Sequence, residues 1–353
     1  MTLVYLPAFD ARESPPHGGT LRTRQITSDL LSCRPIKAVL PISARGYVPG
    51  DETVFLRAKV RWRLSWGHAV HYLRFHRALR HHRAAGMSVC VYEHQAGLIR
   101  LGALAALDLG FKIVGIPHNL ESIAAWNHTD PVSGKCGVDY FVWELGLLGR
   151  MERVLTISQD EFRLLRNVGI DANYYPYFPD REAEQHAAAA RLSRSRSLRD
   201  GPLVVLGSAL NEPTREGMMR IVAQLLLHGT RPIVLAGRGV TSVATRYASP
   251  RLSCFDDVSE VDLQLLLANA SCACVHQERG AGSLTRIRHL LLSGVPVVCN
   301  LIAARDYAGE PGTFVYEHLS QAPELCEAAA GQLVSSNAGP SAMLSRTLQE
   351  LSM

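Results

Sequence analysis

Residues 280–298 read GAGSLTRIRHLLLSGVPVV, and the interpretation of the whole chain depends on this stretch. Its pattern predicts a glycine loop, a helix that carries two arginines, a glycine stop and a buried strand. Gly280 and Gly282 allow the backbone to approach a ligand closely, and the unpaired N–H groups at the helix start attract anions. Arg286 and Arg288 add donors suited to phosphate oxygens. The stretch therefore predicts a phosphate-binding turn.

The position of this turn in the chain points to a second domain. Residues 271–277 predict the strand that leads into the loop. A strand, a phosphate-accepting loop and a helix this late in a long α/β chain favour a nucleotide site. The competing interpretation is an ordinary surface turn whose arginines are solvated.

Short apolar runs alternate with helical patterns in both halves of the chain. The predicted strands are residues 3–7, 36–40, 88–92, 112–116, 154–158, 203–206, 232–236 and 271–277. Such alternation predicts parallel, doubly wound sheets that bind ligands at the carboxyl ends of their strands. We expect four parts: a Rossmann-like domain at 1–180, a linker at 181–201, a second Rossmann-like domain at 202–330 and a helical tail at 331–353.

Composition supports a globular α/β protein. The chain has 353 residues, of which 47% are hydrophobic and 20% charged, so two domains of ordinary size are expected. No apolar run reaches membrane-spanning length, and the N-terminus lacks the basic start of a signal peptide. Eight scattered cysteines without metal-type spacing predict reduced core thiols in a cytoplasmic protein.

Residues 57–83 contain many arginines and histidines and no acidic residue. Trp62, Trp66, Tyr72 and Phe75 lie within this interval. One interpretation is peripheral contact with an anionic membrane surface, with these aromatics at the headgroup boundary. Another is a solvated helix whose aromatics belong to the core. Nucleic-acid binding is not expected.

The turn at 280–298 resembles the donor site of glycosyltransferase family 4, through its Thr-Arg-Ile turn and the run LLLSGVPVV. The resemblance implies a GT-B fold, in which two Rossmann-like domains face a cleft. It also implies transfer of a sugar, with retention of configuration, from a nucleoside diphosphate sugar. The family has a glutamate for the ribose hydroxyls where this chain has His289, so ribose recognition must differ.

The same resemblance assigns roles to individual residues. The His-Asn pair after the strand at 112–116 matches the cleft-lining loop near the transferred sugar, which implies catalytic roles for His118 and Asn119. The implied donor-phosphate residues are Gly18, Gly19, Gly207, Ser208, Arg215, Gly280, Gly282, Ser283 and Arg286. The implied nucleoside-binding residues are Gly237, Val258, Glu278 and His289.

The sequence thus favours a hexosyltransferase-type glycosyltransferase without metal or cofactor, acting on a glycan or lipid-linked acceptor in bacterial surface-polysaccharide synthesis. Two alternatives remain. One is a non-catalytic partner protein of the same fold with an eroded donor site. The other is a sugar-nucleotide epimerase, which needs carboxylates for proton transfer, and Glu93 and Glu121 are the candidates.

Overall fold

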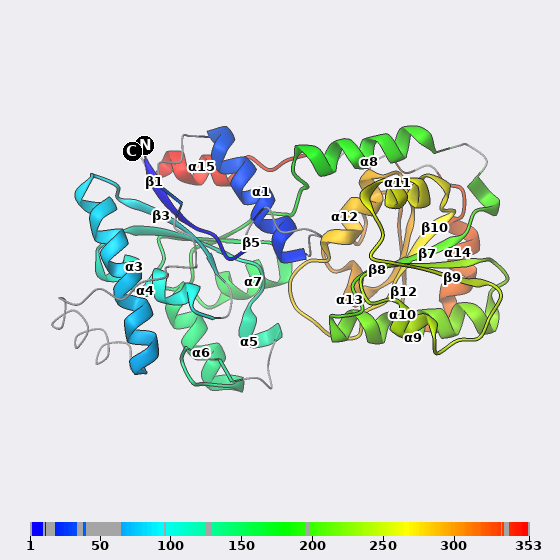
Figure 1. Cartoon of the computed structure of the whole chain (residues 1–353), viewed down its shortest axis with the longest axis horizontal. Coiled ribbons are helices and arrows are strands. Elements are labelled where there is room, and N and C mark those ends of the chain that lie inside the picture. Colours follow the sequence, from blue (N-terminus) through cyan, green and yellow to red (C-terminus); the bar gives the residue numbers. More distant parts are fainter. Residues whose placement is uncertain are drawn as a thin grey trace. The chain divides into compact units, whose positions relative to one another are not determined.

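The computed structural model describes residues 2–9, 11, 18–33, 38–39, 65–94, 97–124, 129–130, 132–194, 198–332, 334 and 339–351. The chain forms two compact units, and each is built around one parallel sheet (Figure 1). Unit 1 comprises Met1–Ser14, Arg22–Pro176 and Ser341–Met353. Unit 2 comprises Pro15–Leu21 and Tyr177–Pro340.

The sheet of unit 1 has the strand order β2-β1-β3-β4-β5-β6. Its strands are β1 (Leu3–Leu6), β2 (Ala38–Val39), β3 (Val89–His94), β4 (Lys112–Pro117), β5 (Arg153–Thr156) and β6 (Ala172–Tyr174). Its helices are α3 (Trp66–Ala84), α4 (Ile99–Asp108), α5 (Glu121–Ala124), α6 (Gly137–Leu148), α7 (Gln159–Asn167) and α15 (Met343–Glu350). Helix α1 (Gly18–Cys33) belongs to unit 1 from Arg22 onward, and its first four residues belong to unit 2.

Alternate strand residues of unit 1 face two different apolar layers, as the two-residue repeat of a strand requires. On one face, Val4 and Cys90 pack with Leu79 of α3 and with residues of α4, α6 and α7. On the other face, Leu3 and Val89 pack with side chains of α1 and α15. Both faces of this parallel sheet are therefore covered.

The sheet of unit 2 has the order β12-β11-β10-β7-β8-β9. Its strands are β7 (Leu203–Leu206), β8 (Ile233–Gly237), β9 (Leu252–Asp256), β10 (Cys272–Val275), β11 (Val297–Asn300) and β12 (Thr313–Tyr316). Its helices are α8 (Arg181–Ser193), α9 (Glu212–His228), α10 (Thr241–Ala244), α11 (Glu260–Asn269), α12 (Thr285–Leu292), α13 (Leu301–Ala304) and α14 (Ala322–Ala329), with 3₁₀ turns η1 (Leu198–Asp200) and η2 (Leu319–Gln321).

The two faces of the second sheet are covered in the same way. Helices α9, α10 and α14 pack on one face, and α8, α11, α12 and α13 pack on the other (Figure 1). In both units the chain starts on an inner strand and winds outward both ways, from β1, beside the edge strand β2, in unit 1 and from β7 in unit 2. This topology makes the carboxyl edge beside each starting strand the expected ligand-binding position.

One structural expectation requires correction, and one pair of predicted site residues falls inside a helix. The helix after the first strand begins at Gly18, so Gly18 and Gly19 form its first turn. In the basic interval, Tyr72 and Phe75 are core residues with 1% and 8% exposure, because they lie on the face of α3 that packs against unit 1. They cannot contact a membrane surface. Residues 57–64, with Trp62, and the side chain of Trp66 lie outside the described residues.

The exposed face of α3 carries arginines instead, among them Arg77, Arg80 and Arg83. None of the helices in the described part of the chain combines the length and the apolar character needed to span a bilayer.

The C-terminal helix α15 is part of the core of unit 1, and this packing can be tested. Leu344 is fully buried, whereas Arg346 on the same helix is exposed. We expect Leu344→Ala to lower the free energy of unfolding of unit 1 by about 2–5 kcal/mol, because it leaves a cavity in a packed layer. Urea denaturation measures this change. Arg346→Ala is the control, and an equally small effect of both substitutions would contradict the packing.

Candidate active site

In unit 1, a buried carboxylate lies at the carboxyl end of β3, next to the first strand β1. Glu93 is fully buried and accepts hydrogen bonds from Thr23 Oγ1 (2.6 Å), the Ala8 amide (3.0 Å) and the Tyr5 hydroxyl. His118, which follows β4, places its Nε2 2.9 Å from Glu93 Oε2. Strand pairing brings these groups together, since Glu93 lies opposite Ile116 in the β3–β4 register.

The hydrogen bonds decide the protonation of this pair. Burial alone would raise the pKa of Glu93, but hydrogen bonds and charge from His118, followed by Thr23 and Tyr5, lower that pKa below its usual value. The ionised carboxylate is an acceptor only, so Nε2 of His118 carries the proton in their bond. Nδ1 of His118 is buried and has no hydrogen-bond partner among the described residues. It is therefore the ring atom with hydrogen-bonding capacity left over.

A second carboxylate–histidine pair lies beside the first. His94 Nε2 is 2.6 Å from Glu144 Oε1, and the Tyr92 hydroxyl is 3.2 Å from His94 Nδ1. Burial, with a smaller contribution from Arg100, lowers the pKa of His94, although Glu144 opposes this. The neutral ring therefore donates from Nε2 to Glu144 and accepts from Tyr92 at Nδ1.

Glu144 connects this pair to the start of α5. Its carboxylate accepts from Ser122 Oγ (2.5 Å), the Ser122 amide (3.0 Å) and the Glu121 amide (3.1 Å). Arg100 approaches the same carboxylate and pairs with Asp130 at 2.5 Å. Burial would raise the pKa of Glu144, but His94, Arg100 and Ser122 outweigh burial and lower that pKa to about 2.

The loop after His118 carries a carboxyl group, that of Glu121, whose pKa is raised rather than lowered. Burial, and next the negative charge of Glu144, raise the pKa of Glu121 to about 7, although a hydrogen bond from the Asn119 side chain opposes the rise. Asn119 thus contacts Glu121 in this structure. A carboxyl group that titrates near neutral pH can exchange a proton under physiological conditions.

In unit 2, the carboxyl ends of the central strands approach each other too closely for side chains. Gly237, at the end of β8, has a φ of +134°, and a Cβ there would lie 2.0 Å from the Gly207 carbonyl oxygen. A Cβ on Gly207 would lie 2.7 Å from a Thr214 methyl group and 3.7 Å from Arg286. These glycines are required by packing, and they leave backbone at the edge of the sheet.

The loop after β10 supplies positive charge at this same edge. Gly280 and Gly282 adopt φ values of +130° and +70°, which favour glycine. Arg286, in the first turn of α12, lies with NH1 3.4 Å from Thr214 Oγ1. Arg305, after α13, donates from NH1 to the Gly280 carbonyl at 2.6 Å. Arg305 thus holds the loop at Gly280, and Arg286 contacts α9 beside it.

Several of these guanidinium donors are unused. Nε of Arg286, Nε of Arg215 and both Nε and NH2 of Arg305 are buried and make no hydrogen bond within the described residues. Burial, with the nearby charge of Arg305 as a smaller contribution, lowers the pKa of Arg286 to about 10, so it stays protonated at neutral pH. Buried, unpaired guanidinium donors are costly unless an anion accepts from them.

Sequence reasoning missed Arg305, as well as Glu144 and Thr23 in unit 1. Arg305 follows β11 and the short helix α13, which come next in the chain after the glycine loop and α12. Its place just beyond the carboxyl end of a strand was the signal that could have identified it. The two arginines near the start of α1 are used within the fold. Arg22 is buried and donates to the Tyr175 carbonyl at 2.7 Å. Arg24 donates to the Ala11 carbonyl at 2.7 Å.

The remaining predicted phosphate residues lie around the same edge. Ser208 follows Gly207 in the turn after β7, and its carbonyl accepts from the Asn211 amide at 3.2 Å. Ser283 donates from Oγ to the Tyr307 hydroxyl at 3.0 Å. Arg215 lies in the first turns of α9. Gly18 lies in the first turn of α1, which belongs to unit 2, and a Cβ on Gly18 would be 3.5 Å from Thr285 Oγ1 at the start of α12. Gly19 is the next residue of that turn.

The predicted nucleoside residues are less clearly grouped. Glu278 is paired with Arg220 of α9 at 3.0 Å, and Val258 lies in the turn between β9 and α11. His289 lies on α12, where burial, followed by the nearby His186 of α8, lowers its pKa to about 4. A neutral histidine there accepts at most one hydrogen bond.

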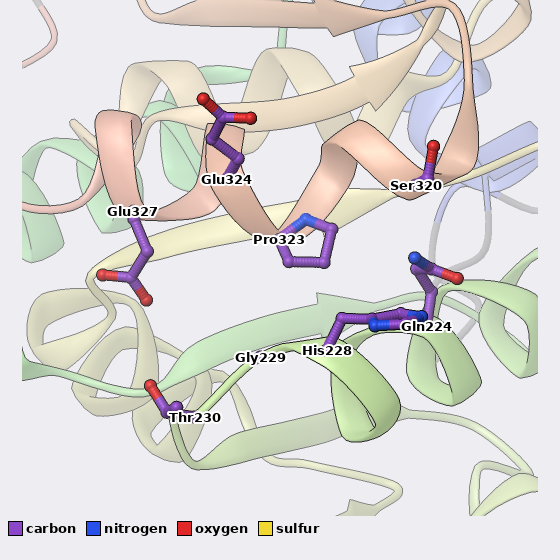
Figure 2. Close-up of a pocket in the computed structure, with 8 residues that line it drawn as sticks. All are labelled: Gln224, His228, Gly229, Thr230, Ser320, Pro323, Glu324 and Glu327. Atoms are coloured by element: carbon purple, nitrogen blue, oxygen red, sulfur yellow. The ribbon is translucent and has the colours of Figure 1, made fainter.

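A separate surface hollow of about 440 Å³ lies at the carboxyl end of α9 (Figure 2). It is lined by Gln224, His228, Gly229, Thr230, Ser320, Pro323, Glu324 and Glu327. Figure 2 shows Gln224 and His228 from α9 on one side and Glu324 and Glu327 from α14 on the other. None of the candidate site residues lines it, so the chemistry is assigned to the sheet edges.

Comparison with known proteins identifies the fold. No protein-family model matches the sequence, and a search of curated proteins found no significant match. Solved structures do match along the whole chain. Sucrose-phosphate synthase from Thermosynechococcus elongatus has a TM-score of 0.62 at 14% identity, covering 100% of this chain and 98% of its own.

Two further structures agree with this result. HepE from Anabaena, crystallised with UDP-glucose, has a TM-score of 0.62 at 12% identity, covering 99% of each chain. AviGT4, a glycosyltransferase of avilamycin A biosynthesis, has a TM-score of 0.53 at 16% identity, covering 99% of this chain and 96% of its own. The predicted fold class is confirmed: the chain has the GT-B fold, with two Rossmann-like units.

The depressed pKa of Glu144 predicts a pH-dependent contribution to stability. Its ionised form stabilises the folded state fully above the usual carboxyl pKa, and this contribution is lost as the pH falls toward about 2. Glu144→Gln should therefore destabilise unit 1 by up to roughly 3 kcal/mol at pH 7. The difference from wild type should shrink below about pH 5. Urea unfolding at pH 7, 5 and 4 measures this difference in the free energy of unfolding. A difference that does not change with pH would contradict the stabilising role of the ionised Glu144.

Proposed function

We propose that this protein transfers a sugar from a nucleoside diphosphate sugar to a hydroxyl acceptor. The observation that carries the proposal is the set of unused guanidinium donors of Arg286, Arg305 and Arg215 at the carboxyl edge of the second sheet. A diphosphate supplies the anionic oxygens that these donors lack.

The same groups would assist the chemical step. Breaking the bond between sugar and diphosphate increases negative charge on the leaving oxygen. Arg286 and the start of α12, where the N-cap residue Leu284 makes no side-chain capping bond, offer donors for that charge. Because these groups are held by the fold, they need no rearrangement during the reaction.

His118 and Glu93 are the residues we assign to the transferred sugar or the acceptor. Glu93 holds the His118 ring by its Nε2 proton, and Nδ1 can accept from a hydroxyl. The resemblance to glycosyltransferase family 4 supports retention of configuration and a bacterial surface glycan or lipid-linked product. HepE was crystallised with UDP-glucose, so UDP is the first nucleotide to test.

Binding of UDP tests the donor site. Arg286→Gln and Arg305→Gln each remove charge-assisted hydrogen bonds worth about 1.5–3 kcal/mol, so each should weaken binding roughly tenfold to a hundredfold. Arg246→Gln changes an exposed arginine in the same unit and should leave binding unchanged. Isothermal titration calorimetry with UDP, GDP, ADP and CMP measures these affinities.

If no nucleotide binds at millimolar concentration, the chain is better described as a partner protein with an eroded donor site. If a nucleotide binds and all three variants bind it equally, the guanidinium groups have been assigned wrongly. Either result would remove the basis of the proposal.

A sugar-nucleotide epimerase remains the second candidate, and the raised pKa of Glu121, about 7, favours it. Of the two candidate carboxylates, Glu93 is engaged by Tyr5, Thr23 and His118, which leaves Glu121 as the better proton acceptor. Incubation of a bound nucleotide sugar without acceptor distinguishes the two. Conversion to its epimer, lost in Glu121→Gln, would favour the epimerase, whereas a transferase should leave the sugar's other stereocentres unchanged.

A further inference from the structure

Three cysteines meet in the core of unit 2, away from the proposed donor site. Cys272 and Cys274 lie two residues apart on β10, so their side chains leave the same face of the sheet. Cys326, on α14, lies over that face. The sulfur atoms of Cys274 and Cys326 are 3.2 Å apart, and all three sulfurs lie within 4.8 Å of one another.

The packing of α14 explains why the sulfurs come so close. Ala322 and Ala329 flank Cys326 at one-turn spacings and are also fully buried in the same layer. Small side chains on this face allow the helix to lie close to β10, and the cysteine is the longer group between them. The three thiols themselves are 0–1% exposed.

The arrangement matches the needs of a soft metal ion. A metal–sulfur distance of about 2.3 Å places two ligand sulfurs roughly 3.8–4.0 Å apart. The Cys274–Cys326 separation of 3.2 Å lies below this value, and no pair of the three sulfurs exceeds 4.8 Å. Small side-chain rotations would therefore bring the three sulfurs into ligand positions. Thiolate ligands select soft ions such as Cu(I) and Zn(II).

We propose that Cys272, Cys274 and Cys326 form a buried binding site for a soft, thiolate-seeking metal ion, with Cu(I) as the best fit. Among the described residues, the cluster offers three ligands of the metal-binding types, whereas structural zinc sites almost always have four. Each thiol that binds the ion releases one proton to solvent, and no electron is transferred.

The site would tie α14 to the strand that carries the glycine loop. Cys274 is followed on β10 by Val275 and then by His276, whose Nδ1 is 2.9 Å from the hydroxyl of Tyr316. A bound ion would therefore stabilise unit 2 and the start of the loop without taking part in sugar transfer. This inference does not depend on the proposed function.

A titration of the full, untagged and fully reduced chain with Cu(I) under anaerobic conditions tests the site. Charge-transfer absorption between thiolate and metal in the ultraviolet should increase with added Cu(I) until one equivalent per chain is bound. Cys326→Ala should weaken binding at least about a hundredfold. Cys299→Ala removes another buried cysteine, in the layer on the other face of the sheet, and should bind like wild type.

A second measurement uses the wild-type chain, so its result does not depend on whether a variant folds. X-ray absorption of the loaded protein should give three sulfur ligands at about 2.3 Å. The proposal is overturned if no equivalent binds. It is also overturned if the ligand set contains nitrogen or oxygen, or if removing the exposed Cys136 abolishes binding while removing Cys326 does not.

Discussion

The chain direction in two parallel sheets is the constraint on which the rest of this structure depends. In each unit the polypeptide starts on an inner strand and winds outward both ways, so loops diverge at the carboxyl edge of β1 and of β7. The glycine loop of unit 2 and the Glu93–His118 pair of unit 1 lie at these two edges. The fold thus creates two places where backbone and polar side chains converge.

The two edges differ in how far their polar groups are satisfied. In unit 1, Glu93 and Glu144 each accept several hydrogen bonds, and each is paired with a histidine. Among the described residues, the buried polar atoms of this network have hydrogen-bond partners, except Nδ1 of His118. The carboxyl group of Glu121 beside it has a raised pKa. In unit 2 the guanidinium groups of Arg286 and Arg305 keep unused buried donors. A network whose polar groups are all hydrogen-bonded holds its side chains in place, whereas buried donors without partners favour a ligand that accepts from them.

Much of the fold was predictable because buried parallel strands are short apolar runs separated by helical patterns. The glycine loop was predictable too, since Gly280 and Gly282 need a backbone that other residues rarely adopt. Periodicity could not tell whether Tyr72 and Phe75 of α3 face solvent or the sheet, and they are buried. At the start of α7, Ser158 makes no side-chain capping bond, and Glu161 accepts instead from the distant Leu120 amide.

The candidate sites were only partly predictable, because they depend on long-range pairing. Glu144 lies 50 residues from His94 along the chain, and their bond exists only because α6 crosses the edge of the sheet. Arg305 and Cys326 likewise acquire their neighbours through strand order rather than spacing in sequence. The position of β11 and of α14 beside β10 could not be derived from local pattern alone.

A crystal structure of the protein with UDP would test the central claim most directly. The account predicts diphosphate oxygens within hydrogen-bonding distance of Arg286 and Arg305, beside the backbone of Gly207 and Gly282, with Nε of Arg286 no longer without a partner. Clear density for UDP elsewhere, such as the hollow between α9 and α14, would contradict it. So would a site at the β7–β10 edge that stays free of nucleotide at saturating UDP.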